Sequence, residues 1–130
     1  MSIEIGKTRI GDVIDENSQK LAEEIALAYY EYDFRMSFSE FQDKCNQVAK
    51  GLMALGIQKG DHISMWANNV PEWVYTQFGS AKMGAVMVTV NTNFKAYELE
   101  YLLKQSDSNT LILVGGVRTP DEYIQVVNEV

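Results

Sequence analysis

The chain has 130 residues, of which 46% are hydrophobic and 22% are charged, and its formal net charge is -7. This composition is typical of one globular domain rather than of a disordered chain. The acidic balance and the lack of any Lys/Arg cluster argue against a nucleic-acid partner, because phosphate binding needs a basic face.

The first part of the chain predicts a helix followed by a β-hairpin. Apolar residues at helical spacing between Ile10 and Leu21 predict an amphipathic helix, with Thr8 as its N-cap. Two aromatic-rich segments, Ile25 to Tyr30 and Phe34 to Phe38, lie on either side of a short turn. Such a pair of segments is typical of an antiparallel hairpin.

A second helix is predicted by a capping box. Ser37 and Glu40 have the spacing at which each side chain can bond the backbone of the other. The apolar face that follows includes Cys45 and continues to Leu55, where Gly56 is the expected left-handed end. On that face Cys45 is expected to be a small buried hydrophobe rather than a nucleophile. Being the single cysteine, it also excludes an internal disulfide and favours a reducing, cytoplasmic setting.

The second half of the chain alternates short apolar strands with helices of ten or more residues. Parallel pairing is expected, because a parallel partner strand can be reached only through a long crossover. The fold class is therefore predicted as α/β, a short parallel sheet with flanking helices plus an N-terminal helix and a β-hairpin. The strands are predicted at His62 to Trp66, Ala85 to Val90 and Thr110 to Val114.

Three further helix starts accompany these strands. Asn69 is expected to cap a helix that runs to Met83, and another helix is expected from about Lys95 to Gln105. Thr119 and Pro120 then predict a start whose helix has barely three turns before Val130. A strong helix start without a stop indicates that the sequence is a fragment of a longer protein.

The loop after the second strand is the one candidate binding site. Asn91, Thr92, Asn93 and Lys95 supply amide groups, a hydroxyl and a cation where a parallel strand ends, and ligands gather at that edge of such sheets. These four residues are the predicted cofactor-binding set, although Asn-rich loops are also common as plain turns. No catalytic residue and no metal ligand is predicted.

Two other features are interpreted as structural. Gly115-Gly116 follows a strand, but GGVRTP satisfies neither the dinucleotide fingerprint nor the triphosphate-loop pattern, so an ordinary strand-to-helix turn is expected. His62 is the single histidine, so neither a Ser-His-Asp triad nor a paired-His metal site can be assembled.

Several segments, in order, resemble the N-terminal part of the adenylate-forming superfamily, which includes acyl-CoA synthetases, peptide-synthetase adenylation domains and luciferases. Each motif alone is weak, but they are colinear from Thr8 to Val114. The continuation KAYELEYLLKQSDSNTLIL is most similar to the fatty-acyl-CoA synthetase branch. The matching segments are MSFSEF (Met36 to Phe41), GLMALGIQKGDHI (Gly51 to Ile63), NNVPEW (Asn68 to Trp73) and AKMGAVMVTVNTNF (Ala81 to Phe94).

The resemblance implies the N-terminal scaffold of an AMP-forming acyl-CoA synthetase. That enzyme class joins a carboxylic acid to ATP and then transfers the acyl group to CoA. In the family the phosphate loop, the adenine-binding motif, the ribose Asp and the catalytic Lys all lie beyond this chain's last residue. The fragment is thus expected to be inactive and to bind no cofactor itself. ATP, Mg, CoA and a fatty or other carboxylic acid are implied for the parent, and the remainder of the synthetase chain is the implied partner.

One departure concerns the candidate loop. Many family members have Asn-Pro-Arg where this chain has Asn91-Thr92-Asn93, so a cationic contact with CoA from that Arg is missing, although Lys95 lies close by. The rival interpretation is a stand-alone binding or regulatory module of flavodoxin-like type.

Two expectations concern the surface. The isolated fragment is expected to self-associate through apolar groups, with Trp66, Trp73, Phe78 and the helix begun at Pro120 as contributors. No membrane anchor is expected, because the N-terminus has no apolar segment of signal-peptide length and the longest apolar run is far below the ~20 residues of a spanning helix.

Overall fold

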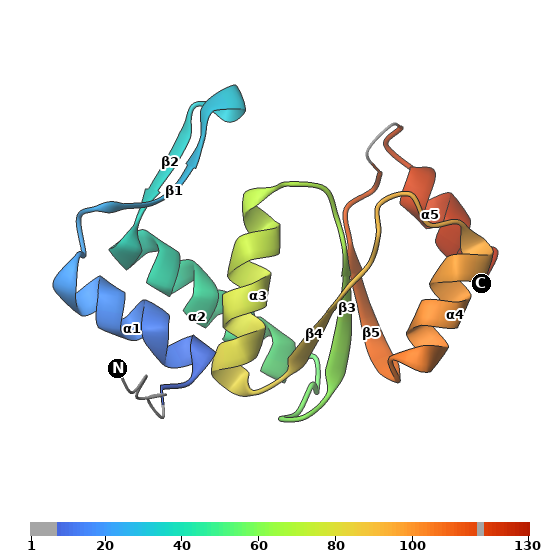
Figure 1. Ribbon diagram of the computed structural model, residues 1–130, viewed down its shortest axis with the longest axis horizontal. Coiled ribbons are helices and arrows are strands. Elements are labelled where there is room, and N and C mark those ends of the chain that lie inside the picture. Colours follow the sequence, from blue (N-terminus) through green and yellow to red (C-terminus); the bar gives the residue numbers. More distant parts are fainter. Residues whose placement is uncertain (1–7, 117–118) are drawn as a thin grey trace, which may run out of the picture.

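The computed structural model describes residues 8–116 and 119–130, so part of the N-terminal segment inspected for a signal peptide, residues 1–7, lies outside the described residues. Its architecture is α/β, as the sequence predicts, and is drawn in Figure 1. The elements are α1 (Ile10–Lys20), β1 (Ile25–Tyr29), the 3₁₀ helix η1 (Tyr30–Tyr32), β2 (Phe34–Ser37), α2 (Phe38–Ala54), β3 (His62–Trp66), α3 (Pro71–Met83), β4 (Val86–Thr89), α4 (Ala96–Gln105), β5 (Ser108–Leu113) and α5 (Glu122–Val127).

The central sheet has the strand order β4-β3-β5, and both pairs are parallel. Ile63 of β3 lies opposite Met87 of β4 and Thr110 of β5. The predicted parallel pairing is thus confirmed. β3 has the predicted bounds, β4 is one residue shorter at each end, and β5 begins two residues earlier and ends one residue earlier than predicted.

Helices cover both faces of this sheet. Figure 1 shows α1, α2 and α3 on one side and α4 and α5 on the other. Because side chains alternate along a strand, the central strand β3 contributes to both layers. Ile63 packs against Leu52 and Ala85 on the first side, whereas Trp66 packs against Leu99 on the second. Ile63, Trp66 and Leu99 are all 0% exposed.

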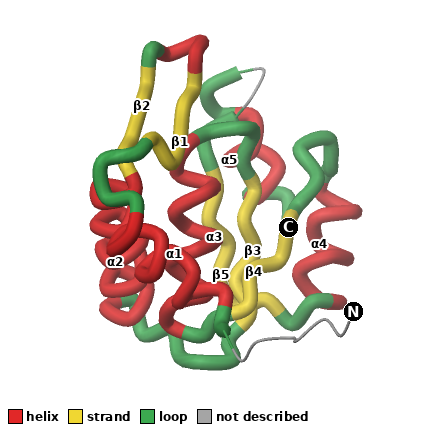
Figure 2. The backbone as a smooth tube through the Cα atoms, turned by 60° about the vertical axis from the view of Figure 1, so that its left-hand side comes forward, coloured by secondary structure: helices red, strands yellow, loops and turns green. Residues whose placement is uncertain are grey.

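The β1–β2 hairpin stands apart from the sheet (Figures 1 and 2) and is antiparallel, as predicted. Its turn ends at Asp33, which has a left-handed φ of 48°. The capping box at the start of α2 is also confirmed: the Ser37 amide donates to Glu40 Oε2 (2.8 Å), and the Glu40 amide donates to Ser37 Oγ (3.3 Å). At the other end, Gly56 takes the predicted left-handed φ of 90°.

Two predicted N-caps are wrong. Arg9 rather than Thr8 precedes α1, and the Asp12 carboxylate accepts hydrogen bonds from the Arg9 amide (3.2 Å) and from Arg9 Nε (3.0 Å). Val70 rather than Asn69 precedes α3, without a side-chain cap. The first position of α3 is a proline, which has no amide hydrogen, so one fewer amide needs a partner.

The last helix begins later than predicted. α5 starts at Glu122, with Asp121 as its N-cap, rather than at Pro120. A Cβ added to Gly115 would lie 2.1 Å from the Pro120 carbonyl oxygen, and one on Gly116 would lie 2.1 Å from the Thr119 carbonyl oxygen. The chain is therefore folded back on the two glycines at Thr119 and Pro120, and the helix begins only after this turn.

Glycine also allows close helix packing on the first side of the sheet. A Cβ on Gly79 of α3 would lie 2.8 Å from Val48 Cβ of α2, and one on Gly11 of α1 would lie 2.8 Å from Lys82 Cα of α3. Contacts this short leave no room for a side chain. The backbone of α3 is thus held against both neighbouring helices.

Candidate functional site at the carboxyl edge of the sheet

The carboxyl ends of β3, β4 and β5 meet at one edge of the sheet because the three strands are parallel. The loop after β3 leads to α3 on one face, whereas the loops after β4 and β5 lead to α4 and α5 on the other (Figure 1). Adjacent connections that leave toward opposite faces open a crevice between them, which is where ligands bind in open α/β sheets. This edge is the candidate functional site.

The predicted loop after β4 is anchored by its backbone. Trp66 Nε1 donates to the Asn91 carbonyl oxygen (3.1 Å), and the Tyr123 hydroxyl donates to the Thr92 carbonyl oxygen (3.3 Å). Within the loop, the Asn91 side-chain oxygen accepts from the Asn93 amide (2.9 Å), which is an Asx turn. The backbone path of the loop is therefore set by contacts with β3 and α5.

The side chains of the predicted set share this loop, and three of them face outward. Asn91, Asn93 and Lys95 are exposed, and Thr92 is half-buried. Lys95 precedes α4, and its amide donates to Glu98 Oε2 (2.9 Å). The structure thus brings the four residues together, but it does not test whether they bind a cofactor, which stays a prediction.

An aromatic stack fastens α5 to this edge. The rings of Trp66 and Tyr123 are parallel to within 9°, with centroids 4.0 Å apart. The Tyr123 amide donates to the Gly115 carbonyl oxygen (2.9 Å). The close approach of Gly115 and Gly116 to the chain before α5 agrees with the predicted strand-to-helix turn.

Sequence reasoning missed part of the crevice. Asn68 and Asn69, which follow β3, line a hollow with Trp73 and Thr92. The same two asparagines line a second hollow beside the hairpin, which includes Tyr29. The signal was present, because both residues lie in the loop that follows a predicted parallel strand. It was not used because Asn69 was interpreted as a helix cap.

The predicted surface contributors differ in how far they are buried. Trp66 is 0% exposed, and Phe78 packs edge-on against Phe41 with ring centroids 5.7 Å apart. The helix expected from Pro120 begins at Glu122 and turns Tyr123 inward, where it is 1% exposed. The placement of Trp66 on the surface was therefore wrong, because its indole belongs to the core, whereas Phe78 is half-buried. Trp73 is half-buried and lines the crevice.

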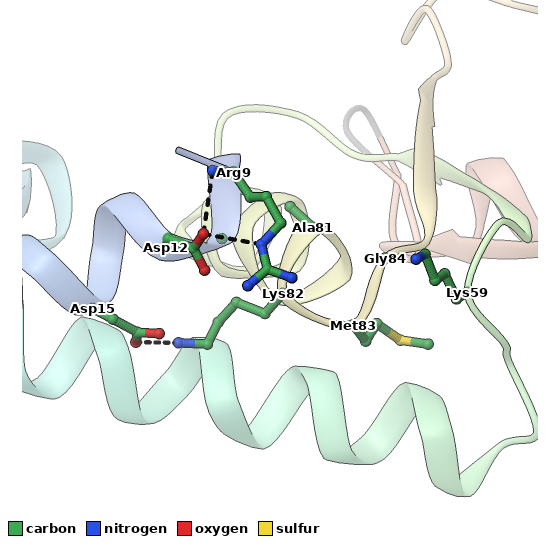
Figure 3. A pocket seen from close by; sticks show the side chains of 9 residues that line it. Arg9, Asp12, Asp15, Lys59, Ala81, Lys82, Met83 and Gly84 are labelled. Carbon is green, nitrogen blue, oxygen red and sulfur yellow. Dashed lines mark hydrogen bonds and ion pairs between the residues drawn. The ribbon is translucent and has the colours of Figure 1, made fainter. Parts of the chain in front are cut away.

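A charged pocket lies between α1 and α3, away from this edge (Figure 3). Lys82 is paired with Asp15, which also accepts a hydrogen bond from Gln42 Nε2 (2.7 Å). The Gln42 bond and then Lys82 hold the pKa of Asp15 below its ordinary value. Because these charges are paired with one another, the pocket serves as a tie between helices rather than as a reactive centre.

The remaining titratable candidates are structural. Cys45 is 0% exposed, and burial raises the pKa of its thiol to about 12, so the thiolate nucleophile is not formed near neutral pH. His62 Nδ1 lies 2.5 Å from the Ser106 carbonyl oxygen and links β3 to the end of α4. Within residues 8–116 and 119–130, no group of three His, Cys, Asp or Glu residues could hold a metal ion.

In the part of the chain that the structure describes, no helix has the length and apolar character needed to span a bilayer.

Comparison with known proteins identifies one family throughout. The profile described as "AMP-binding enzyme" matches residues 14–129. YngI of Bacillus subtilis, an acyl-CoA synthetase by name, is 43% identical over 125 residues, which are 96% of this chain and 23% of that protein.

Solved structures agree. A fatty acyl CoA synthetase of Mycobacterium tuberculosis superposes with a TM-score of 0.84 at 29% identity, over 93% of this chain and 23% of that one. The N-terminal domain of FACL13 from the same organism gives a TM-score of 0.79 at 27% identity, over 88% of this chain and 31% of that one. The chain thus spans about a quarter of the length of full relatives.

Proposed function

The chain belongs to the AMP-binding enzyme family, and from this premise we propose that it is the N-terminal scaffold of an AMP-forming acid–CoA ligase acting on fatty or related carboxylic acids. The observation that supports this most is the superposition on a fatty acyl CoA synthetase with a TM-score of 0.84. The parent reaction consumes a carboxylic acid, ATP and CoA and yields acyl-CoA, AMP and pyrophosphate. ATP, Mg and CoA belong to that parent.

In this proposal the chain supplies a structural scaffold and a binding surface at the carboxyl edge of the sheet, but not the groups that react. Among the described residues, Asp15 and Lys82 share a pocket but are paired with each other, and the Cys45 thiol is buried with a raised pKa, so none of the three suits the role of a reacting group in an active site. The remainder of the synthetase chain is the partner that brings the reacting groups. A cytoplasmic location, favoured by the single cysteine, belongs to the same proposal.

We assign the loop after β4 to cofactor contact. Asn91, Asn93 and Lys95 are exposed beside the crevice, while the loop backbone is anchored by Trp66 and Tyr123. An anchored backbone with exposed polar side chains suits a preformed binding edge. Lys95 is the cation of this loop and would attract the phosphates of CoA.

A chimaera tests the proposal. Residues 1–130 replace the matching segment of YngI, and acyl-CoA formation is measured beside pyrophosphate release and ATP binding by the isolated chain. The chimaera is expected to form acyl-CoA, and the isolated chain to release no pyrophosphate and to show no micromolar ATP affinity. Turnover or tight ATP binding by the isolated chain would instead favour a stand-alone module.

The loop assignment has its own test in the same chimaera. Lys95→Ala is expected to raise KM for CoA several-fold with little change in kcat, because it removes an attraction shared by ground and transition states. Lys50→Ala, at an exposed position on α2, is the matched control. Equal kinetics for the two variants would remove Lys95 from the binding edge.

We also propose that the isolated chain self-associates, since surface that the remainder would cover is left open. Sedimentation velocity over a concentration series is expected to show a rising average mass. A strictly monomeric chain over the whole series would contradict it.

A further inference from the structure

The loop after β4 is held by a residue that lies far along the chain. Tyr123 of α5 lies 31 residues after Thr92, and its hydroxyl donates to the Thr92 carbonyl oxygen at 3.3 Å. The preceding carbonyl oxygen of the loop, that of Asn91, accepts from Trp66 Nε1 at 3.1 Å. Two successive carbonyl groups are therefore bonded to the two rings of one aromatic stack.

The peptide unit between Thr92 and Asn93 is bonded at both of its polar groups. Its carbonyl oxygen accepts from the Tyr123 hydroxyl, and its amide donates to Asn91 Oδ1 at 2.9 Å. Because a peptide unit is planar, a bond at each of these groups sets the orientation of the whole unit. That orientation determines how the chain continues toward Lys95, which is two residues further on.

The Tyr123 hydroxyl is itself accurately placed. The residue is 1% exposed, its ring stacks on Trp66, and its amide donates to the Gly115 carbonyl oxygen at 2.9 Å. Val126 and Val127 of α5 pack against the same buried cluster. The position of the hydroxyl is thus set by the packing of α5, and the path of the loop depends on whether α5 is docked.

Lys95 is attached at both of its ends. On one side the chain reaches it through the peptide unit that Tyr123 holds, and on the other its amide donates to Glu98 Oε2 at the start of α4. Binding groups act well when they are held within about 0.5 Å of the productive position. Loss of the Tyr123 bond would let the chain between β4 and Lys95 move.

We propose that Tyr123 is a positioning residue for CoA, because its hydroxyl orients the loop after β4 so that Lys95 meets the phosphates of CoA. The inference rests on the proposed function. It makes α5 part of the binding site without any contact with the ligand. Docking of α5 and binding of CoA should strengthen each other, since both favour the same conformation of the loop.

Tyr123→Phe in the YngI chimaera tests the role, because it removes the hydroxyl and keeps the ring and the stack. KM for CoA is expected to rise about two- to tenfold, which is the range that one hydrogen bond represents, with little change in kcat. Pyrophosphate release without CoA measures formation of the acyl-adenylate alone and should stay unchanged, whereas a general loss of structure would slow it. Tyr97→Phe, at a position of α4 that is 79% exposed, is the matched control and should alter neither quantity.

A double-mutant cycle tests whether Tyr123 acts through Lys95. In a Lys95→Ala background, Tyr123→Phe is expected to change KM for CoA by less than about twofold, because the cation that the hydroxyl positions is gone. In a Lys50→Ala background the full effect is expected. Equal effects in the two backgrounds would show that the hydroxyl does not act through Lys95 and would overturn the proposal.

Hydrogen exchange measures the reverse effect. Coupling between two sites is reciprocal, so saturating CoA should slow exchange of the Tyr123 amide by about the factor by which Tyr123→Phe raises KM. In the Tyr123→Phe variant CoA should slow exchange of the same amide much less. Equal slowing in both proteins would mean that the hydroxyl does not carry the coupling.

The outcomes separate this proposal from the proposed function. A chimaera that forms acyl-CoA with the same KM for CoA after Tyr123→Phe would overturn the positioning role and leave the function standing. If the chimaera is inactive, calorimetry with CoA still decides: binding weakened by Tyr123→Phe would support the positioning role and count against the function. No measurable binding of CoA by that chimaera would overturn both.

Discussion

The two faces of the sheet are covered in different ways. On one face α1, α2 and α3 are in close backbone contact, as Gly11 and Gly79 require, and the Asp15–Lys82 pair ties α1 to α3. On the other face the short α5 is fastened by the stack of Tyr123 on Trp66 and by its hydrogen bond to the loop after β4. The first face is a packed scaffold, and the second is attached to the candidate site.

This difference predicts which parts of the molecule a substitution on each face should destabilise. A change on the first face should lower the stability of the helix layer and leave the loop after β4 in place. A change in the aromatic stack should lower stability and release the loop as well, because the same two residues, Trp66 and Tyr123, hold both α5 and the loop backbone.

Trp66→Ala should give the largest effect. It removes a fully buried indole, its stack and its bond to Asn91, so the free energy of unfolding should fall by about 3–5 kcal/mol. Chemical denaturation measures this. Trp73→Ala, at a half-buried position on α3, is the comparison and should cost clearly less. Equal losses of unfolding free energy in the two variants would mean that the Trp66–Tyr123 stack adds no extra stability.

Gly79→Ala tests the packed face. The added methyl group would lie 2.8 Å from Val48, and overpacking of this kind costs about 1–3 kcal/mol. Gly51→Ala in α2 is the matched control, because a Cβ there meets nothing within 4 Å. Relieving a helical glycine should stabilise the protein by about 0.5–1 kcal/mol. Stabilisation by both changes would show that α2 and α3 are not in close contact.

Tyr123→Phe separates the stack from the loop contact. The ring is kept while the hydrogen bond to Thr92 is lost, so stability should fall by about 1 kcal/mol. Hydrogen exchange in the loop after β4 should become faster at the same time. Tyr97→Phe, at a position that is 79% exposed, should change neither quantity. A loop unaffected by Tyr123→Phe would contradict the shared attachment.

Asp15→Asn should give the smallest effect, visible mainly as a pH dependence. The Asp15 pKa is lower in the folded protein than its ordinary value of 3.8, so its contribution is present above about pH 4 and is lost as pH falls through the lowered pKa. Because the carboxyl is partly exposed, the contribution should be about 0.5 kcal/mol or less. Denaturation between about pH 2 and 7 measures it, with Asp43→Asn as the exposed control. If the Asp15→Asn variant lost as much stability in acid as the unsubstituted protein, the Asp15–Lys82 pair would not stabilise the contact between α1 and α3.

Local sequence signals predicted most of the elements. The capping box at Ser37 and Glu40, the left-handed Gly56 and the strand His62–Trp66 all depend on neighbours within a few residues. Parallel pairing followed from the crossover lengths alone. These features could be predicted from the sequence because each depends on residues within one helix or strand, or on the length of the segment that connects two strands.

Contacts between distant residues were not predictable in this way. Trp66 and Tyr123 are far apart in the chain, so nothing near Trp66 indicated that a ring would cover it, and it was placed on the surface. The late start of α5 depends on the approach of Gly115 and Gly116 to Thr119 and Pro120, which only the folded turn shows. The asparagines after β3 were missed for a different reason: their position after a predicted parallel strand was a local signal, but Asn69 was interpreted as a helix cap.

Cys45 makes the packed face chemically observable. The thiol is enclosed by α2 and its neighbours and is not ionised near neutral pH, because burial raises its pKa to about 12, so an aromatic disulfide reagent can modify it only when this layer opens. Its modification rate in native buffer therefore reports the opening free energy of the α1–α2–α3 layer. With a single thiol in the chain, the measurement needs no mutagenesis and no correction for a second site.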